Sequence, residues 1–277
     1  MAAISLKRLL DTSQLDWQWL HGHTPSRVYL SPACPATDYR LSCPAPHLLT
    51  LEQSGHRTST LAMHCGVQES APVTAQSVVY TRTDIHSARC ALALALAEHA
   101  GVTATQCHAT LIRMHGLGIL ISGAPGSGKS TLALTLIREA DAALVADDCV
   151  DVRALPGGAV GSCPALLRNY LHIPELGALD IARVFGQTRS VTACQIDLGI
   201  HLTAPEQATP AIKLHGNWRR QILAGVELTT LDLVPRHVQA VALVDIAARM
   251  VARTRRPQTM SDALQQRQQQ AIKDGRA

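Results

Sequence analysis

Hydrophobic residues in the middle of the chain form short continuous runs on either side of one run at helical spacing. The run 116–122 is short and apolar and predicts a buried strand. In the run 130–140 the apolar residues recur at three- and four-residue intervals, which puts them on one face of a helix. These residues are Leu132, Ala133, Leu136, Ile137 and Ala140. A second apolar run at 142–146 predicts another buried strand, so the region has the character of an α/β domain.

Similar patterns predict further elements on both sides of this core. We expect strands at 109–114, 195–202 and 228–233, a hairpin at 151–160, and helices at 87–100 and 239–252. Three segments have weaker patterns: near-helical spacing at 5–20, helical or turn structure at 164–185, and a weakly amphipathic tail at 261–273. The segment 109–114 is close enough to 116–122 to form a hairpin through His115 and Gly116. Because regular helices do not separate the strands near residue 123, we expect a mixed sheet rather than a doubly wound parallel one.

The first hundred residues are less regular than the rest of the chain. Five prolines interrupt the range 24–60 and leave only short strand-like pieces between them. We therefore expect a smaller N-terminal α/β module at 1–102 and a main domain at 103–277, with the boundary near Gly101 and Thr103.

Composition narrows the class of protein. Of the 277 residues, 47% are hydrophobic and 17% charged, which supplies enough apolar material for a core. One Phe, three Trp and four Tyr are too few for a single-strand nucleic-acid platform, and a net charge of +4 does not demand a nucleic acid. We expect no membrane span, because no apolar run approaches about 18 residues. The N-terminus lacks a signal-peptide core and the eight cysteines form no C-x-x-C pair, so we expect a cytoplasmic protein.

The candidate chemistry centres on a glycine-rich sequence between the strand and the helix. Residues 123–130 are G-A-P-G-S-G-K-S and fit the pattern G-x-x-x-x-G-K-[ST] at every fixed position. Glycines let successive main-chain N–H groups turn inward around an anion, and the helix N-terminus adds its partial positive charge. Lys129 can reach the β- and γ-phosphates, and the Ser130 hydroxyl can ligate Mg²⁺. We expect ATP to be bound by Gly123, Ala124, Pro125, Gly126, Ser127, Gly128, Lys129, Ser130 and Thr131.

Two acidic residues follow the second strand. Asp147 and Asp148 stand at its C-terminal end, which is the end at which ligands bind in open sheets. Successive strand residues point to opposite faces, so only one carboxylate can aim directly at the γ-phosphate, and the other would act through Mg²⁺ or water. The alternative is a plain surface turn, because acidic residues are frequent in turns.

Two segments carry a resemblance to a known family. They are HATLIRMHGLGILISGAPGSGKSTLALTLIREADAALVADDCVDV at 108–152 and GSCPALLRNYLHIPELGALDIARVFGQT at 161–188. Both resemble the core of HPr kinase/phosphorylase, the bacterial enzyme that phosphorylates a regulatory serine of the phosphocarrier HPr. The start, RLLDTSQLDWQWLHG at 8–22, is similar to the family's opening helix. The resemblance implies a fold like that of phosphoenolpyruvate carboxykinase, use of ATP and Mg²⁺, an HPr-like protein partner, and assembly into hexamers.

The resemblance implies roles for single residues. Lys129 and Ser130 match the family's phosphate-binding lysine and Mg²⁺ ligand, and His108 matches a histidine near the active site. Asp148 matches the family's proton acceptor if one residue is inserted upstream of it. Asp147 is the alternative base and a candidate Mg²⁺ ligand.

Several family residues are replaced in this chain. His172 stands where the family has a Mg²⁺-ligating Glu, and Pro174 stands where it has an Arg. Glu175 is close by in the sequence and is our candidate for the metal role. Lys213 occupies the position of the arginine in the family's Arg-Leu-Gly stretch, which keeps the positive charge of a catalytic residue but loses the bidentate fork. The family segment linked to the reverse reaction is reduced at 232–238.

These observations predict an ATP-dependent serine kinase of the HPr kinase type. Phosphorolysis, the removal of the phosphate by inorganic phosphate, is expected to be weak or lost. Two other interpretations remain open: a nucleotide-binding sensor without transfer activity, and a kinase that acts on another peptide or a small hydroxy compound.

Overall fold

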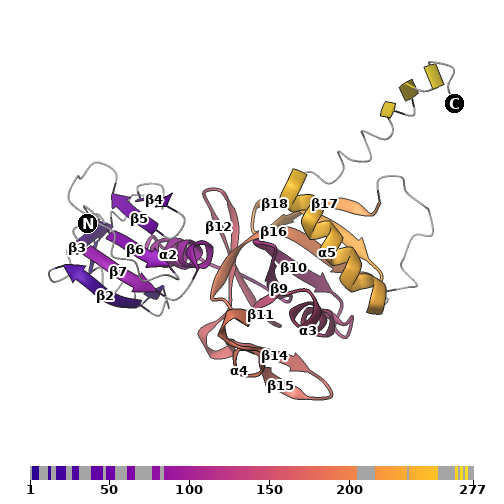
Figure 1. The fold of residues 1–277 in the computed structure, drawn as a ribbon, viewed down its shortest axis with the longest axis horizontal. Helices are drawn as coiled ribbons and strands as arrows, with labels where there is room; N and C mark the ends of the chain where they lie inside the picture. Colours follow the sequence, from indigo (N-terminus) through magenta and orange to yellow (C-terminus); the bar gives the residue numbers. More distant parts are fainter. Residues whose placement is uncertain are drawn as a thin grey trace. The chain divides into compact units, whose positions relative to one another are not determined.

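A computed structural model describes most of the chain from residue 84 onward and separate strands before it. The described ranges are 2–5, 12–13, 17–22, 27–30, 39–45, 48–53, 61–65, 77–81, 84–204, 216–235, 237–254, 266–267, 269–270 and 272–273. The chain divides into two compact units. One contains 1–106, 151–163 and 191–195, and the other contains 107–150, 164–190 and 196–277 (Figure 1). The expected division of the chain into domains at 102/103 stays a prediction.

The first unit contains a five-stranded sheet with the strand order β2-β7-β6-β5-β4. Its strands are β2 (Trp17–Gly22), β4 (Tyr39–Ala45), β5 (Leu48–Gln53), β6 (Leu61–Cys65) and β7 (Ser77–Thr81). Two further strands, β1 (Ala2–Ser5) and β3 (Arg27–Leu30), pair antiparallel with each other. The near-helical spacing at 5–20 suggested a helix, but at its C-terminal end Trp17–Gly22 is a strand that pairs with the distant strand β7. The rest of that segment lies largely outside the described residues.

Helix α2 (Ile85–His99) confirms the helix predicted at 87–100. The Asp84 carboxylate caps it by accepting hydrogen bonds from the main-chain N–H groups of His86 and Ser87, each at 3.1 Å. In the same unit, β12 (Val150–Leu155) and β13 (Gly158–Ser162) form the predicted hairpin, and β8 (Thr105–Cys107) adjoins β12. A small core formed by Cys90, Leu94, Val160 and Ala193 joins this hairpin to α2.

The second unit is built on strands in the order β11-β9-β10-β16-β18-β17. They are β9 (Thr110–Met114), β10 (Leu117–Gly123), β11 (Ala143–Ala146), β16 (Ala193–Leu202), β17 (Trp218–Leu223) and β18 (Val226–Leu233). Strand β10 pairs antiparallel with β9 and parallel with β16, so the expected mixed sheet is confirmed. The turn between β9 and β10 has positive φ at both His115 (53°) and Gly116 (76°), as a two-residue hairpin requires.

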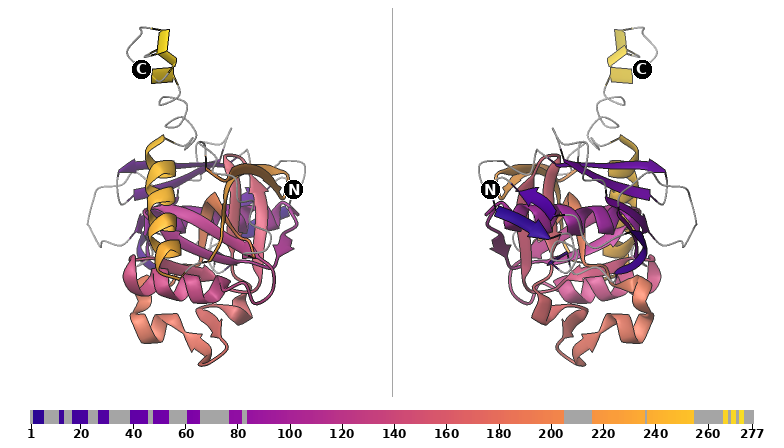
Figure 2. Two further views of the ribbon diagram at one scale, coloured as in Figure 1. Left: turned by 90° about the vertical axis from the view of Figure 1, so that its right-hand side faces the viewer. Right: turned by 90° about the vertical axis from the view of Figure 1, so that its left-hand side faces the viewer.

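Two long helices pack against each other and against β10. They are α3 (Lys129–Glu139) and α5 (His237–Thr254), which confirm the helices predicted at 130–140 and 239–252. Figure 2 (left) shows α5 along the outside of this unit. The core beneath them contains Ile119 and Ile121 from β10, Leu136 from α3 and Val244 from α5, each 0% exposed. None of the described helices has both the length and the apolar character needed to cross a membrane.

The segment 164–185 differs from its prediction as a helical or turn segment. It contains a hairpin of β14 (Tyr170–Ile173) and β15 (Gly177–Asp180), followed by the short helix α4 (Ile181–Phe185). The hairpin forms because Leu171 and Ile173 are buried while the residues between and before them are exposed, which is a period of two. Strand β17 was also missed. The tail at 261–273 lies largely outside the described residues.

Candidate functional site

Three segments meet at one edge of the second unit because of the direction of its strands. Strand β9 runs antiparallel to both β10 and β11, so β10 and β11 run in the same direction and end at the same edge. The glycine loop 123–130 follows β10, the pair Asp147 and Asp148 follows β11, and His108 precedes β9. All three segments therefore lie together at this edge, although about 40 residues separate His108 from the acidic pair in sequence.

The glycine loop has the backbone shape of an anion-binding turn. Gly123, Gly126 and Gly128 have φ of 149°, 75° and 88°, in the region that glycine tolerates best. A Cβ at Gly123 would lie 2.8 Å from both the Leu202 carbonyl oxygen and Ser127 Oγ. Gly128 begins α3 without any side-chain cap, so the first amides of the helix receive no side-chain acceptor. These amides fit a phosphate group.

Two polar groups of the loop lack an anionic partner within the described part of the chain. Lys129 is only 6% exposed, and its Nζ donates to the carbonyl oxygens of Gly123 (3.3 Å) and Ala124 (3.2 Å). Ser127 Oγ is buried and has no hydrogen-bond partner among the described residues. A buried ammonium group is stabilised far more by an anion than by neutral carbonyls. The loop therefore has the donors and the positive charge that nucleotide phosphates require.

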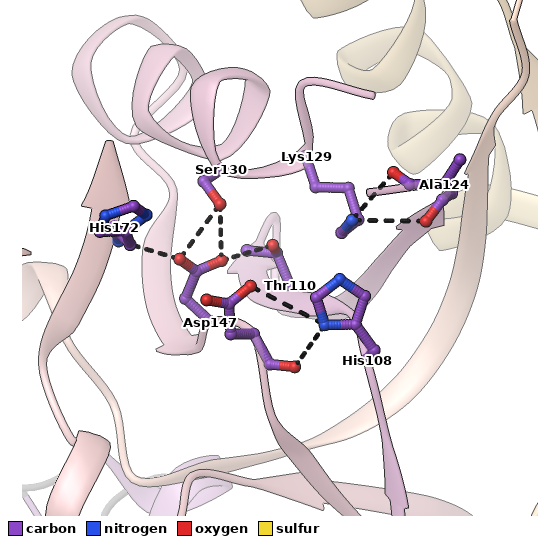
Figure 3. A network of polar contacts seen from close by, with 9 residues as sticks. His108, Thr110, Ala124, Lys129, Ser130, Asp147 and His172 are labelled. Carbon is purple, nitrogen blue, oxygen red and sulfur yellow. Dashed lines mark hydrogen bonds and ion pairs between the residues drawn. The ribbon is translucent and has the colours of Figure 1, made fainter. Parts of the chain in front are cut away.

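Asp147 lies at the centre of a network of hydrogen bonds (Figure 3). The residue is 4% exposed. Oδ1 accepts hydrogen bonds from Thr110 Oγ1 (2.6 Å) and Ser130 Oγ (3.0 Å), and Oδ2 accepts from Ser130 Oγ (3.1 Å) and the His172 main-chain N–H (3.0 Å). No lysine or arginine makes a hydrogen bond or salt bridge with this carboxylate in the described residues, so its charge is stabilised by neutral donors.

Asp148 has a different environment although it is the next residue. Its side chain is 59% exposed, and its φ of 62° lies in the left-handed region. The Cys149 N–H donates to the Asp147 carbonyl oxygen at 2.7 Å, which closes a γ-turn around Asp148. His108 Nδ1 lies 3.0 Å from the Asp148 carbonyl oxygen and 3.8 Å from Asp148 Oδ1. One carboxylate therefore faces the loop serine, while the other is open to an incoming molecule.

A divalent cation would find two oxygen ligands here, Ser130 Oγ and the Asp147 carboxylate. Mg²⁺ is commonly held by one or two protein ligands, substrate phosphates and waters, so this pair suits it. In the described part of the chain, no group of three His, Cys, Asp or Glu side chains is arranged to hold a metal. Glu175 is exposed in the β14–β15 turn, and no described hydrogen bond or ion pair connects it to Ser130 or Asp147. Lys213 lies outside the described residues.

The sequence patterns did not identify three contacts of this site. The first is the hydrogen bond from the Thr110 hydroxyl to Asp147, for which the only signal was one threonine at the start of a mostly apolar strand. The second is the His172 main-chain N–H, which no side-chain motif reveals. The third lies next to the loop, where Ser122 Oγ is 3.1 Å from His201 Nδ1 on the adjacent strand β16.

This chain is similar in sequence to known proteins of one family. A model of the family described as "HPr Serine kinase C-terminal domain" matches residues 100–269, which is more than half of the chain. HPr kinase/phosphorylase of Bordetella pertussis is 44% identical over 99 residues, covering 35% of this chain and 32% of that protein. HPr kinase/phosphorylase of Clostridium perfringens is 31% identical over 158 residues, covering 57% of this chain and 50% of that protein. The matched part of the chain therefore spans about a third to a half of the length of these relatives.

A solved structure described as the Hpr(Ser) kinase/phosphatase from Coxiella burnetii is also similar. It is 27% identical with a TM-score of 0.49, and the match covers 52% of this chain and 88% of that one. The family model defines the class of protein: this chain belongs to the HPr serine kinase C-terminal domain family.

Proposed function

We propose that this protein is an ATP-dependent serine kinase that transfers the γ-phosphoryl group of ATP to a serine hydroxyl of an HPr-like phosphocarrier. The observation that carries this proposal is the contrast between the two adjacent carboxylates. Asp147 is buried and hydrogen-bonded to Ser130 of the glycine loop, whereas Asp148 is exposed beside His108. Phosphoryl transfer needs both kinds of group, one near the metal and one near the acceptor.

The nucleotide would be bound by the loop 123–131. Lys129 would exchange its two carbonyl partners for the phosphates, and the amides at the start of α3 would donate to them. Ser130 and Asp147 would hold Mg²⁺, and Glu175 stays a further candidate ligand. When bound, Mg²⁺ neutralises part of the phosphate charge and orients the nucleotide. These interactions favour a transition state in which negative charge spreads over the transferred group.

Asp148 is the proposed general base. Its exposed carboxylate would accept the proton of the acceptor hydroxyl as the oxygen attacks phosphorus. His108 contacts both the main chain and the carboxylate of Asp148, so it would fix the direction of the base. Lys213 would supply positive charge near the transferred group. An HPr-like acceptor and a homo-hexameric assembly are proposed from the family resemblance.

A direct experiment incubates the protein with labelled ATP, Mg²⁺ and HPr, with small peptides as further acceptors. We expect labelled HPr from the wild type, no labelling by Asp148→Asn, and nucleotide binding retained in that variant. Asp147→Asn should instead lose Mg²⁺-dependent nucleotide binding. Asp141→Asn is a matched control, because Asp141 is also an exposed aspartate with positive φ (57°), and among the described residues its ion pair is with Arg189 and not with any residue of the site. Nucleotide binding without labelling of any acceptor would contradict the kinase assignment.

A second candidate is a nucleotide-binding sensor without transfer activity. The observation that favours it is the presence of His172 and Pro174 where the family has an acid and an arginine. A sensor would show thermal stabilisation by ATP that survives Asp148→Asn, with no turnover in either form. A kinase retuned to another peptide or a small hydroxy compound would instead label that acceptor and not HPr.

A further inference from the structure

Thr110 places a polar side chain at a core position of the sheet. It is the first residue of β9, pairs with Ile121 of β10, and is 0% exposed. The following buried residues of the strand, Leu111, Ile112 and Met114, are all apolar. Valine has the same shape and would fill this position without burying a hydroxyl, whose burial is unfavourable unless it is hydrogen-bonded. A threonine at this position therefore needs a specific partner.

That partner is the Asp147 carboxylate. Thr110 Oγ1 donates to Oδ1 at 2.6 Å, which lies in the short range typical of hydroxyl bonds to an ionised oxygen. Six polar or charged residues are buried in the described part of the chain, and three of them, Thr110, Lys129 and Asp147, belong to this site. The buried polarity of the unit is thus concentrated around the place where phosphate and metal would bind.

The three donors to Asp147 differ in how they are held. Ser130 is shared between both carboxylate oxygens at 3.0 and 3.1 Å, and it is the group that would turn toward Mg²⁺. Thr110 and the His172 N–H each contact a different oxygen, and both are fixed by strands. When Ser130 turns away, these two donors still determine the plane of the carboxylate.

We propose that Thr110 is a positioning residue that orients Asp147 as a Mg²⁺ ligand. This inference rests on the proposed function, because it requires Mg²⁺ and a nucleotide at the glycine loop. Partners that orient a metal ligand typically change metal affinity by about 10–100-fold. No described hydrogen bond joins the Thr110 side chain to the nucleotide loop or to Asp148. A substitution of Thr110 should therefore change the affinity for Mg²⁺ and not the affinity for the nucleotide.

The test compares wild type, Thr110→Val and Thr110→Ser in the full-length chain. At a fixed concentration of ADP, Mg²⁺ is titrated and the melting temperature is followed, and ADP affinity is measured separately in EDTA. We expect Thr110→Val to raise the half-saturating Mg²⁺ concentration by about tenfold without changing ADP affinity in EDTA. Thr110→Ser keeps the hydroxyl and should restore a nearly normal Mg²⁺ requirement. Thr230→Val is the matched control, because Thr230 is also 0% exposed on a strand but donates to the Leu228 carbonyl oxygen.

An unchanged Mg²⁺ requirement in Thr110→Val would overturn the inference while leaving the proposed function intact. Failure of the wild type to bind ADP under any condition would overturn the proposed function and the inference with it. If Thr110→Val does not fold, the double variant Thr110→Val/Asp147→Asn decides. Recovery of folding would support the view that the Thr110 hydroxyl is needed to satisfy the Asp147 carboxylate. Continued failure to fold would show that Thr110 acts only in packing.

Discussion

His108 Nδ1 lies 3.0 Å from the carbonyl oxygen of Asp148 and 3.8 Å from its Oδ1, so one imidazole contacts both the main chain and the side chain of the exposed acid. The two side chains are 53% and 59% exposed, which leaves room for an acceptor beside them. The γ-turn around Asp148 holds its backbone in a strained conformation, and such strain occurs often at functional sites.

We expect His108→Ala to lower kcat for phosphoryl transfer by about 10-fold or more, because Asp148 loses a group that orients it. The KM for ATP should change little, since no described hydrogen bond connects His108 to the glycine loop. Steady-state kinetics with varied ATP at saturating acceptor checks this split. His86→Ala, an exposed histidine in the first turn of α2, is the control and should keep both constants.

Gly123→Ala should abolish nucleotide-induced thermal stabilisation and lower the melting temperature. Its Cβ would lie 2.8 Å from the Leu202 carbonyl oxygen, at a φ of 149° that side chains rarely adopt. Gly101→Ala is the matched control, because Gly101 has φ of 78° and open space around it. That control should lose about 1–2 kcal/mol from backbone strain and keep nucleotide binding. Equal loss of binding in both variants would contradict the close-approach argument.

The stability of the second unit should depend on Asp245 at acidic pH. The hydrogen bond from Arg249 and then that from His115 hold the pKa of Asp245 below its usual value. Because the folded pKa is lowered, this stabilisation is present above the unfolded pKa of about 3.9 and is lost as the pH falls through the folded pKa. Arg138, Glu139 and Asp141 line the same pocket as Asp245.

The measurement compares melting temperatures of wild type and Asp245→Asn. The wild type should be more stable near pH 6 by about 1 kcal/mol or less, as for other surface ion pairs. This difference should shrink as the pH drops below about 4. If the stability difference between wild type and Asp245→Asn instead grows toward low pH, folding does not lower the pKa of Asp245.

Phosphorolysis should be much weaker than phosphorylation. The reverse reaction brings a second multiply charged anion beside the first, and the two repel unless cations converge on them. His172 and Pro174 replace an acid and an arginine of the family pattern, and Lys213 replaces a second arginine. The forward reaction brings in a neutral hydroxyl and is less affected. Phosphoserine-HPr with excess inorganic phosphate and Mg²⁺ should release little pyrophosphate. Release at the forward rate would mean that another acid, such as Glu175, completes the metal site.

Much of the second unit could be predicted because its signals are local. The β9–β10 hairpin, α3 and β11 each follow from patterns within about ten residues, and the glycine loop is one continuous motif. Strand alternation does not explain the different surroundings of Asp147 and Asp148, because both lie beyond the end of β11 and a γ-turn around Asp148 separates them. The Thr110 contact could not be predicted, because it joins residues 37 positions apart and depends on β9 lying between β10 and β11.

The β14–β15 hairpin was missed for a related reason. Each strand has four residues, which is too short for a period of two to stand out against a helical period. The N-terminal strands were obscured in another way: Trp17–Gly22 pairs with Ser77–Thr81, and a pattern confined to 5–20 contains nothing of that partner.

The bond from the His172 main-chain N–H to Asp147 has a consequence for how this protein can evolve. Every residue except proline supplies the same N–H, so the side chain at position 172 can be exchanged without releasing Asp147. The side chain beside the proposed metal site can therefore change while the Asp147 carboxylate keeps this hydrogen bond. Successive substitutions at position 172 could therefore change the charge beside Asp147 without loss of the main-chain hydrogen bond to it.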